Sequence, residues 1–182
     1  MILSINGILA GKGIVDDAQA FITAASITDS TQQNAIIQLV TDLKTANIWS
    51  KMRAIYPFVG GTASSHRFNL KDPRQVSGAF YITFYGGGTH SLNGYQPDGA
   101  TAYGNTSFIA NNHLTNSSGH ISIYSRTNIE EASCDFGASK TPSSFALEGP
   151  EQVILTRYPS LGIVSVYGSY STSMQVANND SR

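Results

Sequence analysis

The segment FYITFY, residues 80–85, decides the fold that this sequence predicts, because its side chains alternate in character. Phenylalanine or isoleucine occupies positions 80, 82 and 84, and tyrosine or threonine occupies the positions between them. A period of two is that of a β-strand with one buried face. The same alternation recurs at 121–124, 153–156 and 163–170, and shorter candidate strands lie at 54–59, 106–109, 133–136 and 143–147.

Clusters of glycine, proline, asparagine and aspartate separate these strands, at 86–88, 97–99, 116–119 and 149–150. Many short strands with turn signals between them are typical of an antiparallel β-sandwich or jelly roll. Helical periodicity is absent between the later strands, which argues against a parallel α/β sheet. The predicted fold class is therefore mainly β.

Two helical patterns precede the strands. Asp16 is the expected N-cap of the first helix, with Gln19 completing a capping box and an apolar stripe at positions 18, 21, 22 and 25. A second helix is expected to start at Asp29 or Ser30, with apolar residues at 36, 39, 40 and 43, and to end near residue 46. The chain is thus divided into a helical docking segment, residues 1–52, and a sandwich, residues 53–182.

Composition bounds the function. The chain has 182 residues, enough for one sizeable domain, and 13% of them are charged, about half the usual share. The net charge is −1, so no overall field favours nucleic acid or an anionic membrane. The first 15 residues lack the basic start and unbroken apolar run of a signal peptide or membrane span. We therefore expect neither nucleic-acid binding nor membrane insertion.

The motifs of common enzymes and metal sites are absent. No two acidic residues stand two apart, the spacing that would place both on one face of a strand. A pair from separate strands, such as Asp135 with Glu148, remains an alternative for a glycosidase. The four histidines lack metal-ligand spacing and are interpreted as surface or rim residues. The prediction is a protein without catalytic residues, metal or cofactor.

Two groups of residues are candidates for contact with partners. Aromatic rings among hydroxyl and amide side chains suit a glycan or a protein interface equally, and the first group is Tyr81, Tyr85, Tyr95, Tyr103, Tyr124 and His90. A second group is basic and aromatic and is interpreted as a docking patch for a neighbouring subunit, with a solvated junction as the alternative. It comprises Trp49, Lys51, Arg53, Tyr56, Arg67, Lys71 and Arg74.

Several stretches resemble a module found in virion proteins of bacteriophages. They are DAQAFITAA (17–25), IWSKM (48–52), IYPFVGG (55–61) and HRFNLKDPR (66–74), with a weaker match at HISIYSRT (120–127). In that family a helical segment leads into a concanavalin-like, laminin-G-like jelly roll on tail fibres, tail tips or head decorations. The resemblance implies a structural or host-recognition role and supplies no catalytic residues. Such jelly rolls generally run several strands beyond the point at which this sequence stops.

The function expected from this resemblance is that of a displayed phage structural protein, located in the virion and made in the cytoplasm of a bacterial host. Its expected partners are other virion proteins, further copies of the chain and a host-surface glycan. The sandwich could be unusually small, truncated, or completed by a partner's strand. A stand-alone carbohydrate-binding module is the first alternative, and a sandwich glycosidase is the second.

Overall fold

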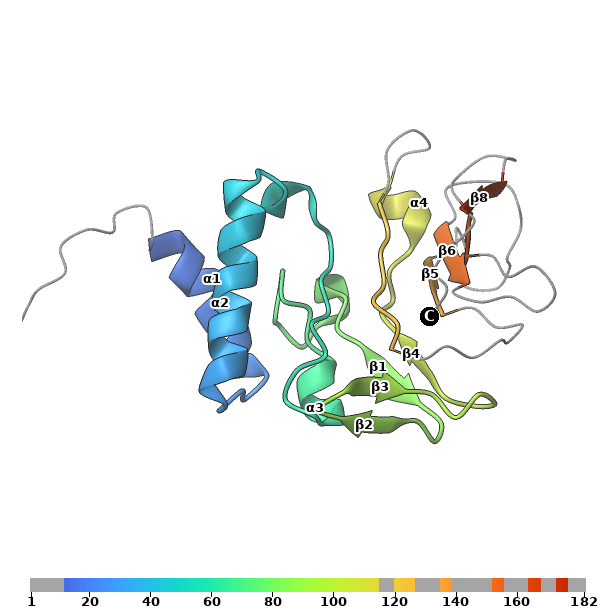
Figure 1. Cartoon of the computed structure of the whole chain (residues 1–182), viewed down its shortest axis with the longest axis horizontal. Helices are drawn as coiled ribbons and strands as arrows, with labels where there is room; N and C mark the ends of the chain where they lie inside the picture. Colours follow the sequence, from blue (N-terminus) through green and yellow to red (C-terminus); the bar gives the residue numbers. More distant parts are fainter. Residues whose placement is uncertain are drawn as a thin grey trace, which may run out of the picture. The chain divides into compact units, whose positions relative to one another are not determined.

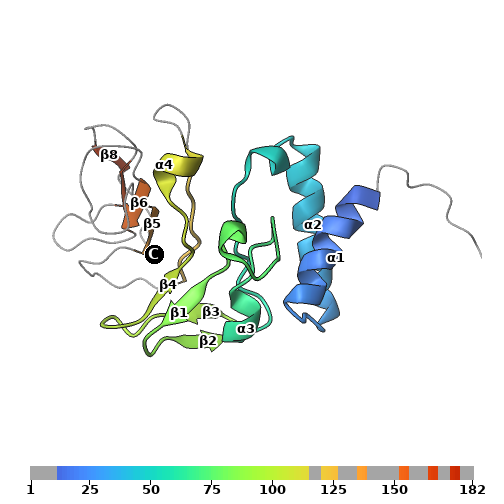
Figure 2. The same cartoon turned by 180° about the vertical axis from the view of Figure 1, so that it is seen from behind.

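A computed structural model describes residues 12–114, 120–126, 135–138, 152–155, 164–167 and 173–176. The chain divides into two compact units, Met1–Ser107 and Phe108–Arg182. The first unit starts with two helices and continues through short helical turns into two β-ribbons (Figures 1 and 2). Its elements are α1 (Lys12–Ala24), α2 (Ser30–Thr45), η1 (Trp49–Lys51), α3 (Ala63–His66), η2 (Ser77–Ala79), β1 (Thr83–Tyr85), β2 (Thr89–Ser91), β3 (Gly94–Gln96) and β4 (Tyr103–Asn105).

Helices α1 and α2 lie side by side and supply most of the described core (Figure 1). The predicted apolar stripe of α1 and the residue that follows it is confirmed, since Ala18, Phe21, Ile22 and Ala25 are all at most 4% exposed. Helix α2 contributes Ile36 and Val40 to the same cluster. Each large side chain removed from water in this way stabilises the fold by roughly 1.5–3 kcal/mol.

The start of α2 is confirmed and that of α1 is corrected. The carboxylate of Asp29 caps α2 by accepting a hydrogen bond from the backbone N–H of Gln32, at 2.8 Å. Helix α1 begins at Lys12, so Asp16 lies within the helix rather than at its N-cap. The side chain of Gln19 donates to the hydroxyl of Thr23, at 3.3 Å, instead of completing a capping box.

The core continues beyond the helices into residues 55–70. Phe68 and Leu70 are buried against the helical pair, with Ile55 and Val59 partly buried beside them. The core therefore joins residues on both sides of position 52. Isolated helices of this length are marginal in water, so this packing accounts for their stability. The division of the chain into a docking segment and a displayed segment remains a prediction.

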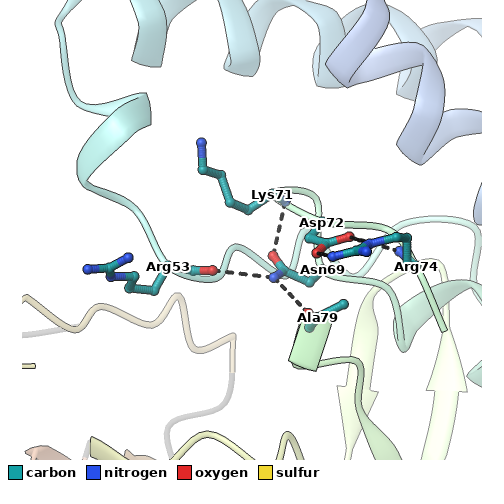
Figure 3. Close-up of polar contacts among 6 residues, drawn as sticks. All are labelled: Arg53, Asn69, Lys71, Asp72, Arg74 and Ala79. Atoms are coloured by element: carbon teal, nitrogen blue, oxygen red, sulfur yellow. Dashed lines mark hydrogen bonds and ion pairs between the residues drawn. The ribbon is translucent and has the colours of Figure 1, made fainter. Parts of the chain in front are cut away.

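Asn69 holds the chain around this core together (Figure 3). Its side chain is fully buried, and its Oδ1 accepts hydrogen bonds from the backbone N–H groups of Ile55, at 2.9 Å, and Lys71, at 3.0 Å. Its Nδ2 donates to the carbonyl oxygens of Ala79, at 3.0 Å, and Arg53, at 3.4 Å. One amide thus satisfies backbone groups that would otherwise lose their partners on burial.

The ribbons that follow are antiparallel and short. In the first ribbon β1 pairs with β4, and Tyr85 lies directly opposite Tyr103. In the second, β2 pairs with β3, and His90 lies opposite Tyr95. Among the described residues, each of these ribbons has two strands of three residues.

The second unit contains one antiparallel sheet in the order β5-β6-β7-β8. A short helix, α4 (Ala110–His113), precedes it, and the strands are β5 (Phe136–Ala138), β6 (Gln152–Leu155), β7 (Val164–Tyr167) and β8 (Ser173–Val176). The predicted strands at 153–156 and 163–170 therefore have described counterparts in β6 and β7. The candidate at 133–136, which lies partly outside the described residues, shares only Phe136 with β5. Residues 121–124 form no strand, and the candidate strand at 143–147 lies outside the described residues.

The predicted fold class is wrong: the chain is not a mainly-β jelly roll or sandwich. Its described strands form separate antiparallel sheets of two, two and four strands, and helices form the largest described core. The apolar residues of 55–70 pack on α1 and α2 instead of forming paired β-strands. At 54–59, Phe58 also has a positive φ of 51°, which interrupts an extended chain.

The deciding segment, residues 80–85, is only half strand. Phe80 adopts a left-handed conformation, with φ 57°, at the end of η2. Its carbonyl accepts a hydrogen bond from the hydroxyl of Tyr56, and the N–H of Ile82 donates to the carbonyl of Arg67, at 2.7 Å. The backbone of 80–82 is therefore bonded to the preceding loops, and the ladder starts at Thr83. Alternation in side-chain type does not reveal such competing partners.

No helix in the part of the chain that the structure describes is long and apolar enough to cross a membrane.

We predict that Asn69→Ala destabilises the protein by about 3 kcal/mol or more, because it leaves several buried backbone groups without partners. Urea unfolding followed by the fluorescence of Trp49, the single tryptophan, measures this change. The matched control is Asn105→Ala, which removes an exposed side chain that accepts one hydrogen bond from Ser107. This control is expected to cost about 1 kcal/mol or less. Equal effects of the two substitutions would refute the role assigned to Asn69.

Candidate functional site

The end of the β1–β4 ribbon carries an exposed pair of tyrosines. The rings of Tyr85 and Tyr103 are stacked, with centroids 4.9 Å apart and an interplanar angle of 17°. They are 47% and 55% exposed. The strand register causes this pairing, because directly opposed residues in an antiparallel ladder place their side chains on the same face. Large aromatic surfaces left in water beside polar groups are typical of recognition sites.

An acidic turn adjoins this pair. Asp98 Oδ1 accepts hydrogen bonds from the backbone N–H groups of Ala100, Thr101 and Ala102, at 2.8–2.9 Å. Its Oδ2 accepts one from the hydroxyl of Thr101, at 2.7 Å. These bonds, the hydroxyl first, hold the pKa of Asp98 well below its usual range. The carboxylate is therefore charged and fixed in direction.

Close backbone contact joins the acidic turn to the end of β1. Gly86 has a φ of +73°, and a Cβ placed there would lie 2.4 Å from the carbonyl oxygen of Thr101. A Cβ at Gly87 would lie 3.2 Å from Asp98 Oδ2. The triple glycine is thus the place where the two chain segments approach each other, which agrees with its interpretation as a turn.

The β2–β3 ribbon and α3 enclose a pair of histidines. The Nδ1 atoms of His66 and His90 lie 3.0 Å apart, at hydrogen-bond distance. His66 is 1% exposed and meets the ring of Phe58 edge-on, while His90 packs between Phe84 and Tyr95. Burial lowers the pKa of His66 to about 4, with a further contribution from His90, and burial also lowers the pKa of His90. Both rings are therefore neutral at pH 7.

The hydrogen bond between the rings requires one proton at the shared position. If His66 donates from Nδ1, its buried Nε2 is a bare acceptor; if it accepts there, Nε2 carries a buried proton. No described group bonds to that Nε2. Buried donors without partners are rarer in proteins than buried acceptors without partners, which favours His66 as the donor. A doubly protonated pair has no acceptor at this position, so acid must break the contact.

The predicted docking patch is only partly one surface. Lys71 lies over the indole of Trp49, with Nζ 4.2 Å from the ring centroid, and Lys44 approaches the same ring at 5.5 Å. Lys44 also forms an ion pair with Asp17, at 2.5 Å. Burial lowers the pKa of Lys71, with Asp17 opposing and Lys44 adding to that change. The Trp49 indole thus makes cation–π contacts with two lysines at the surface of the helical core.

The other patch residues have separate roles. Arg74 forms a bidentate ion pair with Asp72, at 2.6 and 2.7 Å, and this contact lowers the pKa of Asp72. The Tyr56 hydroxyl is bonded internally to Phe80, and burial raises its pKa. Arg67 lies over the ring of Tyr81, 5.8 Å from its centroid, and so joins the two predicted groups. Lys51 and Arg53 are exposed.

The predicted glycan group is also divided. Tyr85 and Tyr103 come together, Tyr95 packs on His90, and Tyr81 lies beneath Arg67. Tyr124 belongs to the second unit and is 83% exposed. Sequence reasoning missed Asp98 as a site residue, although the Asp-Gly-Ala-Thr run is a signal for an Asx-type turn. It also placed His66 at the surface, since nothing local reveals that a histidine will be buried.

Potential metal ligands do not cluster in the part of the chain that the structure describes. No group of three or more His, Cys, Asp or Glu side chains there could hold a metal ion. The alternative carboxylate pair cannot be placed, because Glu148 lies outside the described residues.

Comparisons with protein-family models, with curated proteins and with solved structures found no match to this chain.

The histidine pair predicts acid-dependent stability. An imidazole whose pKa is lower in the folded than in the unfolded state binds fewer protons when folded, so stability falls as the pH is lowered. For His66 the window runs from about 6.5 down to about 4, and the loss is roughly 3 kcal/mol. Urea unfolding at several pH values in this window measures it.

The control variants separate His66 from other titrating groups. We expect His66→Leu to flatten the pH dependence in this window, whereas His120→Gln, a change at an exposed histidine, leaves it intact. The lowered pKa values of Asp72 and Asp98 act mainly below this window, since both carboxylates titrate near 3.8 in the unfolded chain and lose their contribution as the pH falls through that value. His90, whose pKa burial also lowers, leaves part of the pH dependence in place. A slope as steep in His66→Leu as in the wild type would contradict this assignment.

Proposed function

We propose that the chain is a structural component of a bacteriophage particle, a fibre, tail or capsid-decoration protein that works by binding and assembly rather than by catalysis. The observation that carries the proposal is where the phage-like stretches lie. IWSKM, IYPFVGG and HRFNLKDPR supply the indole, the backbone and the amide of a single scaffold centred on Asn69. A structural role of these stretches in the scaffold would account for their recurrence among phage proteins without any catalytic role.

The scaffold leaves charged groups for contact with other subunits. Lys51 and Arg53 are exposed and follow Trp49 closely in the sequence. Asp72 and Arg74 form an ion pair with each other. Arginine and aromatic residues are enriched at protein interfaces. We propose that this surface contacts neighbouring virion proteins or further copies of the chain. Weak contacts suffice on a particle, because many fixed copies raise the effective concentration.

A second candidate function is that of a carbohydrate-binding module. The stacked, exposed pair of Tyr85 and Tyr103 favours it, since flat aromatic surface beside polar groups suits a sugar ring. The two functions are compatible in one protein that is assembled into a particle and attaches to a host surface.

The particle proposal predicts that the chain is present in many copies in purified phage particles. Quantitative mass spectrometry of gradient-purified particles from an infected culture measures the copy number relative to the major capsid protein. The isolated chain is expected to form a trimer or larger species in light scattering at several concentrations. Its absence from particles would refute the virion role, whatever the chain binds.

We also predict that neutralising the exposed cations, with Lys51→Gln and Arg53→Gln together, lowers incorporation into particles by about tenfold or more. That loss corresponds to about 1.4 kcal/mol of contact energy. The matched control exchanges the two cations, Lys51→Arg with Arg53→Lys, and keeps the charge. Urea unfolding establishes that both variants are folded. Equal incorporation of the two variants would assign the docking contact to another surface.

A further inference from the structure

Tyr85 and Tyr103 form the last pair of the β1–β4 ladder, and the acidic turn adjoins them at Gly86 and Thr101. Gly86 follows Tyr85 and touches the backbone of Thr101, which is two residues before Tyr103. The hydrogen bond from Ala102 to Asp98 brings the carboxylate to the same chain ends. Aromatic surface and a fixed anionic acceptor are therefore presented together.

Tyr85 and Tyr103 differ from Tyr81 and Tyr95 in the side chains that lie against their rings. The ring of Tyr81 has Arg67 over it, and the ring of Tyr95 is stacked on His90 and touches Phe84. Tyr85 and Tyr103 stack on each other, with 4.9 Å between their ring centroids, and remain 47% and 55% exposed. That spacing leaves no room for a ligand between the rings, so their outer faces and edges form the available surface.

The acidic turn retains capacity to accept a further hydrogen bond. Three of the bonds to Asp98 go to Oδ1, and one, from Thr101, goes to Oδ2. A carboxylate has about four lone-pair sites, two on each oxygen. Oδ2 therefore has an open site among the described contacts. Since the carboxylate is already held in place, a ligand hydroxyl or ammonium group that binds there orders no flexible side chain.

Charge restricts the ligand. Between Arg74 and Arg126 the sequence contains no Asp, Glu, Lys or Arg apart from Asp98. The ribbon end thus has one fixed negative charge and no cation beside it in the sequence. It complements hydroxyl-bearing or cationic groups and opposes anionic ones.

We propose that Tyr85, Tyr103 and Asp98 form a binding site for a neutral or amino-substituted saccharide. The C–H face of one sugar ring packs on an outer tyrosine face, and a sugar hydroxyl or amine donates to Asp98 Oδ2. Glycans whose terminal residues carry carboxylates are excluded by repulsion. This inference deepens the attachment role in the proposed function and rests on it, although binding is measured independently of particle incorporation.

The test is a glycan array probed with the full-length chain, clustered through a terminal affinity tag so that weak sites register. The array carries maltooligosaccharides, mannooligosaccharides, N-acetylated and free-amine chitooligosaccharides, and galacturonic acid oligomers. We expect signal on one or more of the neutral or amino-sugar sets and none on the acidic set. The best-binding oligosaccharide is then titrated calorimetrically against wild-type and variant proteins.

The variants identify the site. Tyr103→Ala and Tyr85→Ala are each expected to weaken binding by about tenfold or more, while Tyr103→Phe, which keeps the ring, stays within about threefold of wild type. The matched control is Tyr124→Ala, which removes a more exposed tyrosine from the other unit and should leave affinity unchanged. Thermal unfolding verifies that every variant is folded.

Three outcomes would overturn the inference. They are no binding to any set on the array, binding confined to the acidic oligomers, and affinity that Tyr103→Ala and Tyr85→Ala leave intact. A chain found in particles that binds no saccharide would retain the virion role and lose this site. A chain that binds saccharide through these tyrosines but is absent from particles would retain the site as that of a free module.

Discussion

The side-chain amide of Asn69 satisfies two backbone donors and two backbone acceptors from three stretches of chain, residues 53–55, 71 and 79. Phe68 and Leu70, on either side of it, are buried in the helical core. The polar side chain therefore fixes the loops, and its apolar neighbours fix the same segment to α1 and α2. Burying loop backbone without partners costs free energy, so the amide contacts of Asn69 lower the cost of burying its apolar neighbours.

The contacts around Asn69 also determine where the exposed pair of Tyr85 and Tyr103 lies. Ala79 ends η2, and Phe80 then takes a left-handed turn that directs the chain toward β1. The contact of Ile82 with Arg67 sets the start of the ladder, and the ladder register places Tyr85 opposite Tyr103. The exposed aromatic pair thus depends on contacts made far from it, and we expect its geometry to be rigid only while the Asn69 contacts persist.

The sequence predicted local features well and their assembly badly. The stripe at 18–25, positions 36 and 40 of the α2 stripe and the cap at Asp29 were correct because helical periodicity and capping depend on neighbours in sequence. The sandwich was wrong because alternation specifies a two-sided segment and not its partner. Ile55, Val59, Phe68 and Leu70 could have faced a second sheet or a helix pair, and only tertiary packing decides between them.

The same limit applies to the site. Composition identified tyrosines as the chemistry of interest, but opposed register, a cation above Tyr81 and a histidine against Tyr95 determine which rings remain available. Asp98 escaped notice because a lone acidic residue in a turn has an ordinary structural explanation. Its position beside the tyrosine pair follows from the glycines at 86 and 87, because the absence of side chains there lets the turn approach the end of β1. Such an arrangement depends on close backbone approaches between segments distant in sequence, and a sequence motif does not reveal them.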